Sequence, residues 1–184
     1  MQVFDENEKP KKTKILKKIT KQRLKNIALY YLKRYETSVD NLRQVLRKRI
    51  NDYAYQNKEF DKSEAYGWAE EILSDFQRYG YVDDARFAEI RIRDYIQAGK
   101  SVRYIQGKLR EKGVDSELVN SVLENQEYDE FETALKLARK KHIGPFRPDE
   151  DARYEYHQKD MGALVRAGFS YDVVTRVLEF QPEE

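Results

Sequence analysis

The 184-residue sequence contains no cysteine, and glycine and proline are scarce, at eight and four residues. The lack of cysteine excludes disulfide scaffolds, thiolate zinc sites and thiol nucleophiles, and it suits a reducing compartment. No apolar run approaches the roughly 18 to 20 residues that span a bilayer. The start of the chain, MQVFDENEKP, lacks the basic-then-apolar order of a signal peptide. We therefore expect a cytoplasmic protein with no membrane partner.

Residue patterns that support catalysis or metal binding are scarce as well. The two histidines, His142 and His157, lie 15 residues apart and have no ligand pattern around them. The tripeptide at residues 99–101, Gly-Lys-Ser, is similar to the end of a phosphate-binding loop, but Asp94 stands where the first glycine is needed. A helix terminus explains the tripeptide better. We expect no catalytic residue, no metal site and no cofactor, and hence a protein that is not an enzyme.

Charge is distributed unevenly along the chain. Residues 1–8 carry three acids and no base, residues 9–50 have a net charge of +13, and residues 51–184 have a net charge of −8. A basic N-terminal quarter favours a polyanion or an acidic protein surface as a partner. We interpret residues 1–20 as a basic flexible tail that could contact single-stranded DNA. The side chains of this tail that we expect to make the contact are Lys11, Lys12, Lys14, Lys17 and Lys18.

The spacing of apolar residues indicates helices rather than strands. From residue 24 to residue 35, apolar side chains recur at steps of three and one, which places them on one helix face. Thr37 or Ser38 then stops this helix and caps a second one, and Thr37 followed by Asp40 has the form of a capping box. Further on, Gly99 is placed to end a helix and Ser101 to begin another. The predicted fold class is all-α.

Part of the sequence repeats. Leu109, Gly113, Leu118 and Leu123 recur as Leu164, Gly168, Val173 and Leu178, at a constant offset of 55 residues. This internal repeat predicts three units of three helices in tandem, forming an elongated, curved helical array of right-handed type.

The units are predicted at residues 21–80, 81–126 and 127–184. The first unit lacks the glycine after its second helix and carries an insertion at residues 51–67. There we favour a short loop near residues 57–61 followed by a long helix from about Ser63, because long unstructured stretches are uncommon inside compact domains. Two prolines predict a loop between Ile143 and Asp151.

The 14 tyrosines could stack on nucleic-acid bases, but most fit a structural interpretation better. Four continue apolar helix faces and are expected in the core or at its edge: Tyr31, Tyr35, Tyr95 and Tyr154. Three others lie off any such face and are left open: Tyr53, Tyr55 and Tyr66.

Three segments follow one another along the chain as recognisable motifs: GYVDDARFA at 80–88, SVRYIQGKLREKGV at 101–114 and GFSYDVVTRVL at 168–178. They resemble the RecX family of bacterial recombinase regulators, and the resemblance spans roughly residues 26–180. It implies a non-enzymatic protein that binds the RecA filament on single-stranded DNA, in the groove of the filament. It also implies inhibition of recombinase, ATPase and co-protease activity, and so modulation of DNA repair and the SOS response. The first unit and the lysine-rich tail depart from the family pattern.

A tandem array explains how such a chain could regulate a filament. An elongated molecule can touch several protomers at once, and several weak contacts held together act at a high effective concentration. We expect a monomer that uses outward-pointing basic side chains for contact with RecA or DNA. The candidates are Arg43, Arg47 and Arg49 in the first unit, Arg91, Arg103, Lys108, Arg110 and Lys112 in the second, and Arg139, Lys140 and Lys141 in the third.

A second hypothesis comes from another functional class. The chain could be a nucleoid-type protein whose helical units act directly on DNA, with the basic tail as an anchor. The net charge of −8 over residues 51–184 argues against it, because proteins that live on duplex phosphates are usually basic throughout.

Overall fold

The computed structural model describes residues 16–181, and within that range the chain forms α-helices and one short 3₁₀ helix, with no strand. The prediction of an all-α fold is confirmed. The helices are α1 (Lys21–Leu32), α2 (Val39–Gln56), α3 (Lys62–Arg78), α4 (Asp84–Gln97), α5 (Val102–Glu111), α6 (Ser116–Glu124), α7 (Glu130–Lys141), η1 (Gly144–Phe146), α8 (Glu150–Glu155), α9 (His157–Arg166) and α10 (Tyr171–Leu178).

The helices form three groups, each with a hydrophobic core of its own, which we call units 1, 2 and 3. Unit 1 comprises α1–α3, and its core includes Leu42 and Phe76. Unit 2 comprises α4–α6 around Ile92 and Leu109, and unit 3 comprises α7–α10 around Leu164. Because the buried residues of each core contact one another and not those of another core, the three units pack separately.

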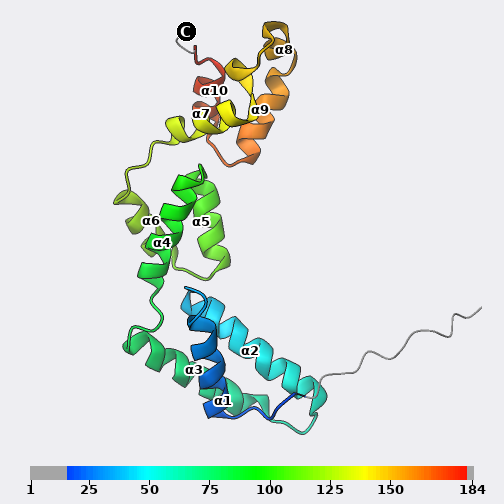
Figure 1. Ribbon diagram of the computed structural model, residues 1–184, viewed down its shortest axis with the longest axis vertical. Coiled ribbons are helices and arrows are strands. Elements are labelled where there is room, and N and C mark those ends of the chain that lie inside the picture. The colour runs from blue at the N-terminus through cyan, green and yellow to red at the C-terminus, as the bar shows by residue number, and fades with distance from the viewer. Residues whose placement is uncertain (1–15, 182–184) are drawn as a thin grey trace, which may run out of the picture.

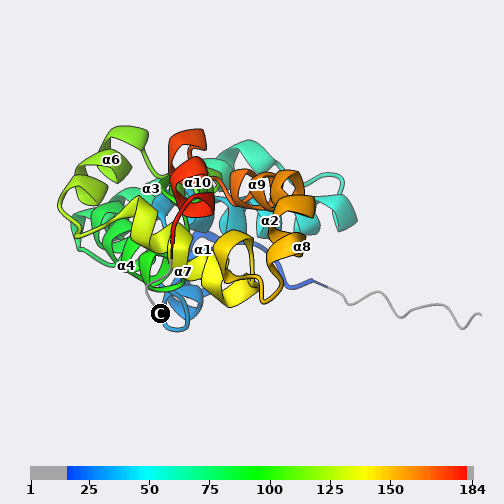
Figure 2. The same cartoon turned by 90° about the horizontal axis from the view of Figure 1, so that it is seen from above.

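The three units follow one another along the long axis of an elongated molecule (Figure 1). The middle unit is offset to the left of the other two in this view, so the stack bends there. Seen along the stack, unit 3 lies over the two units beneath it (Figure 2). The prediction of tandem helical repeats is confirmed.

The repeat extends to backbone conformation at the end of the second helix in units 2 and 3. Gly113 and Gly168 have φ angles of 70° and 96°, and the residue after each is buried. The N–H groups of Val114 and Phe169 donate to the carbonyls of Leu109 and Leu164, five residues back. Glycine is needed at such helix ends because other residues rarely adopt positive φ.

The expected insertion in unit 1 is incorporated into two helices. Residues 51–56 extend α2, residues 62–67 begin α3, and the loop between them covers only residues 57–61. The short loop and long helix that we favoured are therefore found. Unit 3 departs from three helices, because the predicted loop between Ile143 and Asp151 contains η1 and the start of α8.

Two predictions near the N-terminus need correction. Residues 1–20 were expected to be a flexible tail, but Ile19 is only 4% exposed in the core of unit 1, and Thr20 caps α1. The residue that caps α2 is Ser38, whose hydroxyl accepts from the N–H of Asn41. The side chain of Asp40 bonds Arg43 and Gln44 instead, so the expected capping box is absent.

The tyrosines follow the apolar pattern only in part. Tyr31 and Tyr95 pack against the cores of units 1 and 2, as predicted, and Tyr53 and Tyr66 pack against the core of unit 1. The core assignment was wrong for Tyr35 and Tyr154, which are 55% and 91% exposed, and Tyr55 is exposed too.

None of the helices in residues 16–181 is both long and apolar enough to cross a membrane.

Candidate interaction surface

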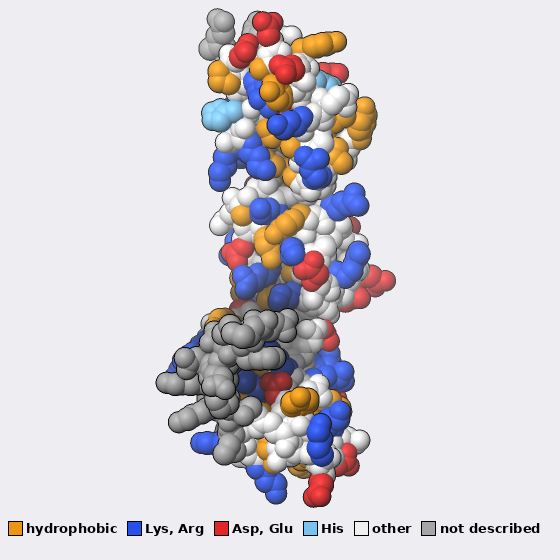
Figure 3. Space-filling view, turned by 90° about the vertical axis from the view of Figure 1, so that its right-hand side faces the viewer, with side chains coloured by type: hydrophobic (Ala, Val, Ile, Leu, Met, Phe, Trp, Pro, Cys, Tyr) orange, Lys and Arg blue, Asp and Glu red, His pale blue; other side chains and the backbone are white. Residues whose placement is uncertain are grey.

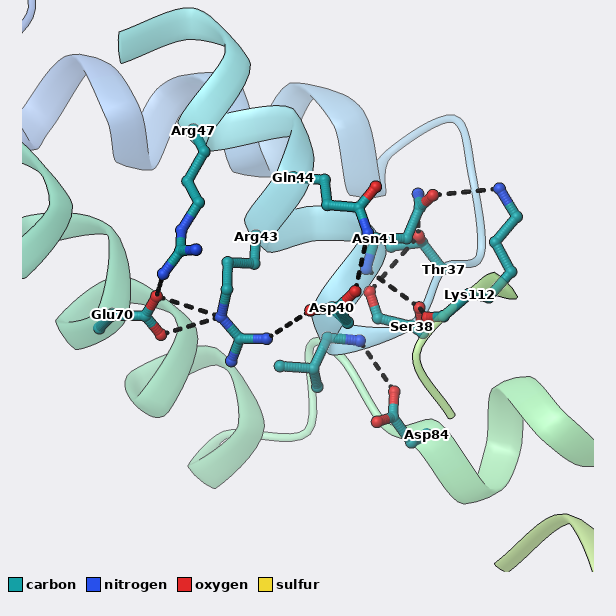
Figure 4. A network of polar contacts seen from close by, with 11 residues as sticks. Thr37, Ser38, Asp40, Asn41, Arg43, Gln44, Arg47, Glu70, Asp84 and Lys112 are labelled. Carbon is teal, nitrogen blue, oxygen red and sulfur yellow. Dashed lines mark hydrogen bonds and ion pairs between the residues drawn. The ribbon is translucent and has the colours of Figure 1, made fainter. Parts of the chain in front are cut away.

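The contact between units 1 and 2 is built from the N-terminal end of α2 (Figure 4). Ser38, fully buried, donates its hydroxyl proton to the carbonyl of Lys112, at the end of α5. The N–H of Val39 donates to the carboxylate of Asp84 over 2.8 Å. The ammonium of Lys112 reaches Asn41 Oδ1 at 3.1 Å. These bonds fix the second unit against the first and leave few buried polar groups unpaired.

The same contact recurs between units 2 and 3. Ser101, also fully buried, caps α5 and donates its hydroxyl proton to the carbonyl of Ala167 over 2.8 Å. Ala167 precedes Gly168, just as Lys112 precedes Gly113. In both interfaces a cap serine of one unit therefore binds the carbonyl before the glycine of the next unit.

Close approach explains why both positions are glycine. A Cβ added to Gly113 would lie 2.4 Å from Asp40 Cβ, and one added to Gly168 would lie 2.4 Å from Ser101 Oγ. Gly99 also has a positive φ, but a Cβ there would meet nothing within 4 Å. The repeat glycines are thus required by the neighbouring unit as well as by the turn.

Two of the three predicted basic residues in unit 1 are engaged within the unit. The guanidinium of Arg43 bonds Glu70 and Asp40, and Arg47 bonds the same Glu70 (Figure 4). Burial alone would lower the pKa of Arg43, but the hydrogen bonds with Glu70 and Asp40 raise it. Arg49 is exposed beside α1.

Some of the basic residues predicted in unit 2 as contact residues form ion pairs within the unit, and others do not. Arg91 lies 3.5 Å from Asp94, and Lys108 lies 2.8 Å from Glu111, each one helical turn apart. Hydrogen bonding to Glu111 raises the pKa of Lys108. Lys112 holds the interface with unit 1. Among the predicted residues of unit 2, Arg103 and Arg110 are exposed and have no ion pair in residues 16–181.

A large cavity of about 1090 Å³ lies where units 2 and 3 meet. It is bounded by the end of α4 and start of α5, by one side of α7, and by the end of α9. Lys and Arg side chains gather on the face of the molecule around this level of the stack (Figure 3). Five cationic side chains line the cavity: Lys100, Lys136, Lys140, Lys141 and Arg166.

These five cations have no ion pair within the described part of the chain, whereas three acids also line the cavity. One acid, Asp129, is committed to capping α7, because its side chain accepts from the N–H of Glu132. Tyr128 lines the cavity and donates its hydroxyl proton to the carbonyl of Lys100, and burial raises its pKa to about 12. The arrangement suits an anionic partner that bridges two units.

Of the five cations that line the cavity, the sequence analysis named Lys140 and Lys141 and did not name Lys100, Lys136 or Arg166. The i, i+4 spacing of Lys136 and Lys140 on α7 was a readable signal, since it places both on one helix face. Nothing local to Lys100 or Arg166 indicated the cavity, because their proximity depends on how two units meet.

The remaining candidates are scattered. The guanidinium of Arg139 lies 5.1 Å from the ring centroid of Phe146, which belongs to the same unit. Lys17 and Lys18 are exposed before α1. Lys11, Lys12 and Lys14 lie outside the described residues. Within residues 16–181 there is also no group of three or more His, Asp or Glu side chains that could hold a metal ion.

The fold and surface define a class of protein: a tandem array of three-helix domains, linked by repeated interfaces, with basic side chains on successive domains. Sequence profiles identify two of these domains. Residues 83–123 match the second three-helix domain of RecX, and residues 127–178 match the third.

Relatives match over most of the chain. A protein of Myxococcus xanthus named "Regulatory protein RecX" is 34% identical over 168 residues, covering 90% of this chain and 89% of its own. One of Agrobacterium fabrum with the same name is 33% identical, covering 87% and 84%. The crystal structure of RecX from Lactobacillus salivarius has a TM-score of 0.65 at 20% identity, covering 86% of this chain and 94% of that one. The chain belongs to the RecX family of regulatory proteins.

Proposed function

We propose that this chain binds the RecA filament on single-stranded DNA and inhibits its recombinase, ATPase and co-protease activities, and so modulates DNA repair and the SOS response. The observation that carries the proposal, beside family membership, is the repeated interface. Two equivalent contacts hold three domains in one elongated molecule, which presents separate basic sites to successive subunits of a polymer.

Polymerisation of the partner explains the selectivity of such a molecule. Each site binds a protomer weakly, but sites held at a fixed separation bind adjacent protomers at a high effective concentration. Free protomers cannot offer this arrangement, so the regulator binds polymer in preference to monomer. The cavity between units 2 and 3, which is lined by Lys136 of α7 and Arg166 of α9, is the proposed main contact.

The test is the single-strand-dependent ATPase of the cognate recombinase. The protein should suppress it at substoichiometric ratios, and the double variant Lys136→Gln/Arg166→Gln should suppress it several-fold less. The matched control, Lys62→Gln/Arg93→Gln, removes two exposed cations that lie away from the cavity and have no ion pair in residues 16–181. It should act like the unaltered protein.

The nucleoid-type alternative predicts a different result. A protein acting directly on DNA would bind duplex tightly with steep salt dependence and would leave the ATPase unchanged at an equimolar ratio. That outcome would replace the filament proposal.

A further inference from the structure

A second basic groove lies in unit 1, well away from the cavity between units 2 and 3. It has a volume of about 530 Å³ and runs between α1 and the C-terminal half of α2, with residues 16–20 as its third wall. Its apolar lining includes the buried Ile19 and the partly buried Ile27, so side chains packed in the core of unit 1 form the base of the groove.

One side of α1 supplies polar side chains to the groove. Gln22, Asn26 and Tyr30 follow at intervals of four residues and so lie along one helix face. The amide of Gln22 donates to Asn26 Oδ1 over 2.9 Å. This pairing leaves the carbonyl oxygen of Gln22 and the amide group of Asn26 available to hydrogen-bond a ligand.

Three cations line the groove: Lys17, Arg23 and Arg49. Arg23 Nε is buried and has no hydrogen-bond partner, which is a costly state for a charged donor. Neither Arg23 nor Arg49 has an ion pair within residues 16–181, although Asp52 lines the same groove. Elsewhere in unit 1 the pattern is the opposite, because Arg43 and Arg47 share Glu70.

Two aromatic rings also line this groove. Tyr30 lines the groove and is 59% exposed, and the guanidinium of Arg34 lies 4.3 Å from its ring centroid. A second ring, that of Tyr53, lines the groove from α2. Cations beside accessible aromatic faces are the combination that binds single strands, with phosphates on the cations and bases stacked on the rings.

We propose that this groove binds a single nucleic-acid strand, with Arg23 and Arg49 on consecutive phosphates and Tyr30 as a stacking surface for a base. An acidic peptide would satisfy the arginines but would make no use of the Tyr30 ring or the free amides. The proposal does not rest on the filament function, because the strand is held by unit 1 itself. It also differs from binding through Lys11, Lys12 and Lys14, because Arg23, Tyr30 and Arg49 belong to α1 and α2.

The experiment measures binding of a fluorescent oligothymidylate by anisotropy at several salt concentrations, using the full-length chain. Arg23→Gln/Arg49→Gln should weaken binding roughly tenfold, and the salt dependence should become shallower by about 1.4, since each phosphate contact on a single strand contributes about 0.7. Tyr30→Ala should weaken binding without changing the salt dependence. Lys62→Gln/Arg93→Gln serves as the matched control and should bind normally.

Other outcomes would overturn the proposal. One is unchanged affinity in both groove variants, with circular dichroism showing that they are folded. Another is a loss of binding in Lys11→Gln/Lys12→Gln/Lys14→Gln that equals or exceeds the loss in the groove variant. A third is displacement of the oligonucleotide by polyglutamate at equal charge concentration, which would indicate an acidic protein partner.

ATPase inhibition retained by the Arg23→Gln/Arg49→Gln variant would separate this groove from the filament contact.

Discussion

Asp160 is the most buried carboxylate that the structure describes, at 2% exposure in unit 3. It accepts hydrogen bonds from the N–H of Gly144 and from two nitrogens of Arg147, at 2.7 to 2.8 Å. Burial alone would raise the pKa of Asp160, but these hydrogen bonds and the charge of Arg147 outweigh it and lower the pKa. The pair therefore ties η1 and the chain after it to α9.

Replacing Asp160 with Asn should destabilise unit 3 by about 2 to 4 kcal/mol, because Arg147 loses its partner in a partly buried place. Trp68, the only tryptophan, packs against the core of unit 1, so its fluorescence reports that unit. In urea, circular dichroism of Asp160→Asn should show an earlier loss of helix while the Trp68 transition stays in place. A shift of both transitions together would mean that the units unfold as one.

The lowered pKa of Asp160 also contributes to the pH dependence of unit 3. A carboxylate with a depressed folded pKa stabilises the protein above its unfolded pKa of about 3.9, and the contribution is lost as pH falls through the folded value. The free energy of unfolding of unit 3 should thus fall below about pH 4. The Asp160→Asn variant should show a flatter acid limb, measured by helix content during urea unfolding.

At the scale of elements, the two kinds of glycine at helix ends allow a clean comparison. Gly99→Ala places a side chain at positive φ in open space and should cost about 1 kcal/mol. Gly113→Ala has the same backbone strain and in addition a clash with Asp40, at the interface between units 1 and 2. Urea unfolding should show the larger loss for Gly113→Ala, and small-angle scattering should show a change in overall dimensions for that variant alone.

Helices, caps and turn glycines could be predicted from the sequence because they depend on neighbours within a few residues. The sequence identified Ser101 as a helix start and Gly168 as a repeated glycine, but it did not indicate that each lies at a contact between units. The hydrogen bond from Ser101 to the carbonyl of Ala167 joins residues 66 positions apart, and no periodicity of the sequence indicates it. The environment of the basic residues was harder to predict for the same reason, since Arg43 and Arg47 on α2 both pair with Glu70 on α3.

Units 1 and 3 each contain one half of the repeated interface. Unit 1 lacks the repeat glycine, and no unit precedes it among the described residues to press against that position. In unit 3, α9 begins at His157 without a side-chain cap, where units 1 and 2 have Ser38 and Ser101. Within the described residues, unit 1 thus has only the serine half of the contact and unit 3 has only the glycine half.

For the whole molecule, the cap serines should control avidity. In Ser38→Ala/Ser101→Ala each helix loses a cap, at a cost of about 1 kcal/mol, and both interfaces lose a hydrogen bond. The units should remain folded but hold each other less firmly. Because avidity depends on fixed separation between sites, inhibition of the recombinase ATPase should weaken several-fold while helix content stays near normal.

Ser170→Ala provides the matched control, because Ser170 caps α10 through the N–H of Val173 and forms no bond between units in residues 16–181. It should lose similar cap stability and keep full inhibition. Equal inhibition by the double variant and the control would show that the relative placement of the units is unimportant for filament binding. Small-angle scattering of the same samples decides whether the interfaces loosened, since a larger maximum dimension is expected for Ser38→Ala/Ser101→Ala only.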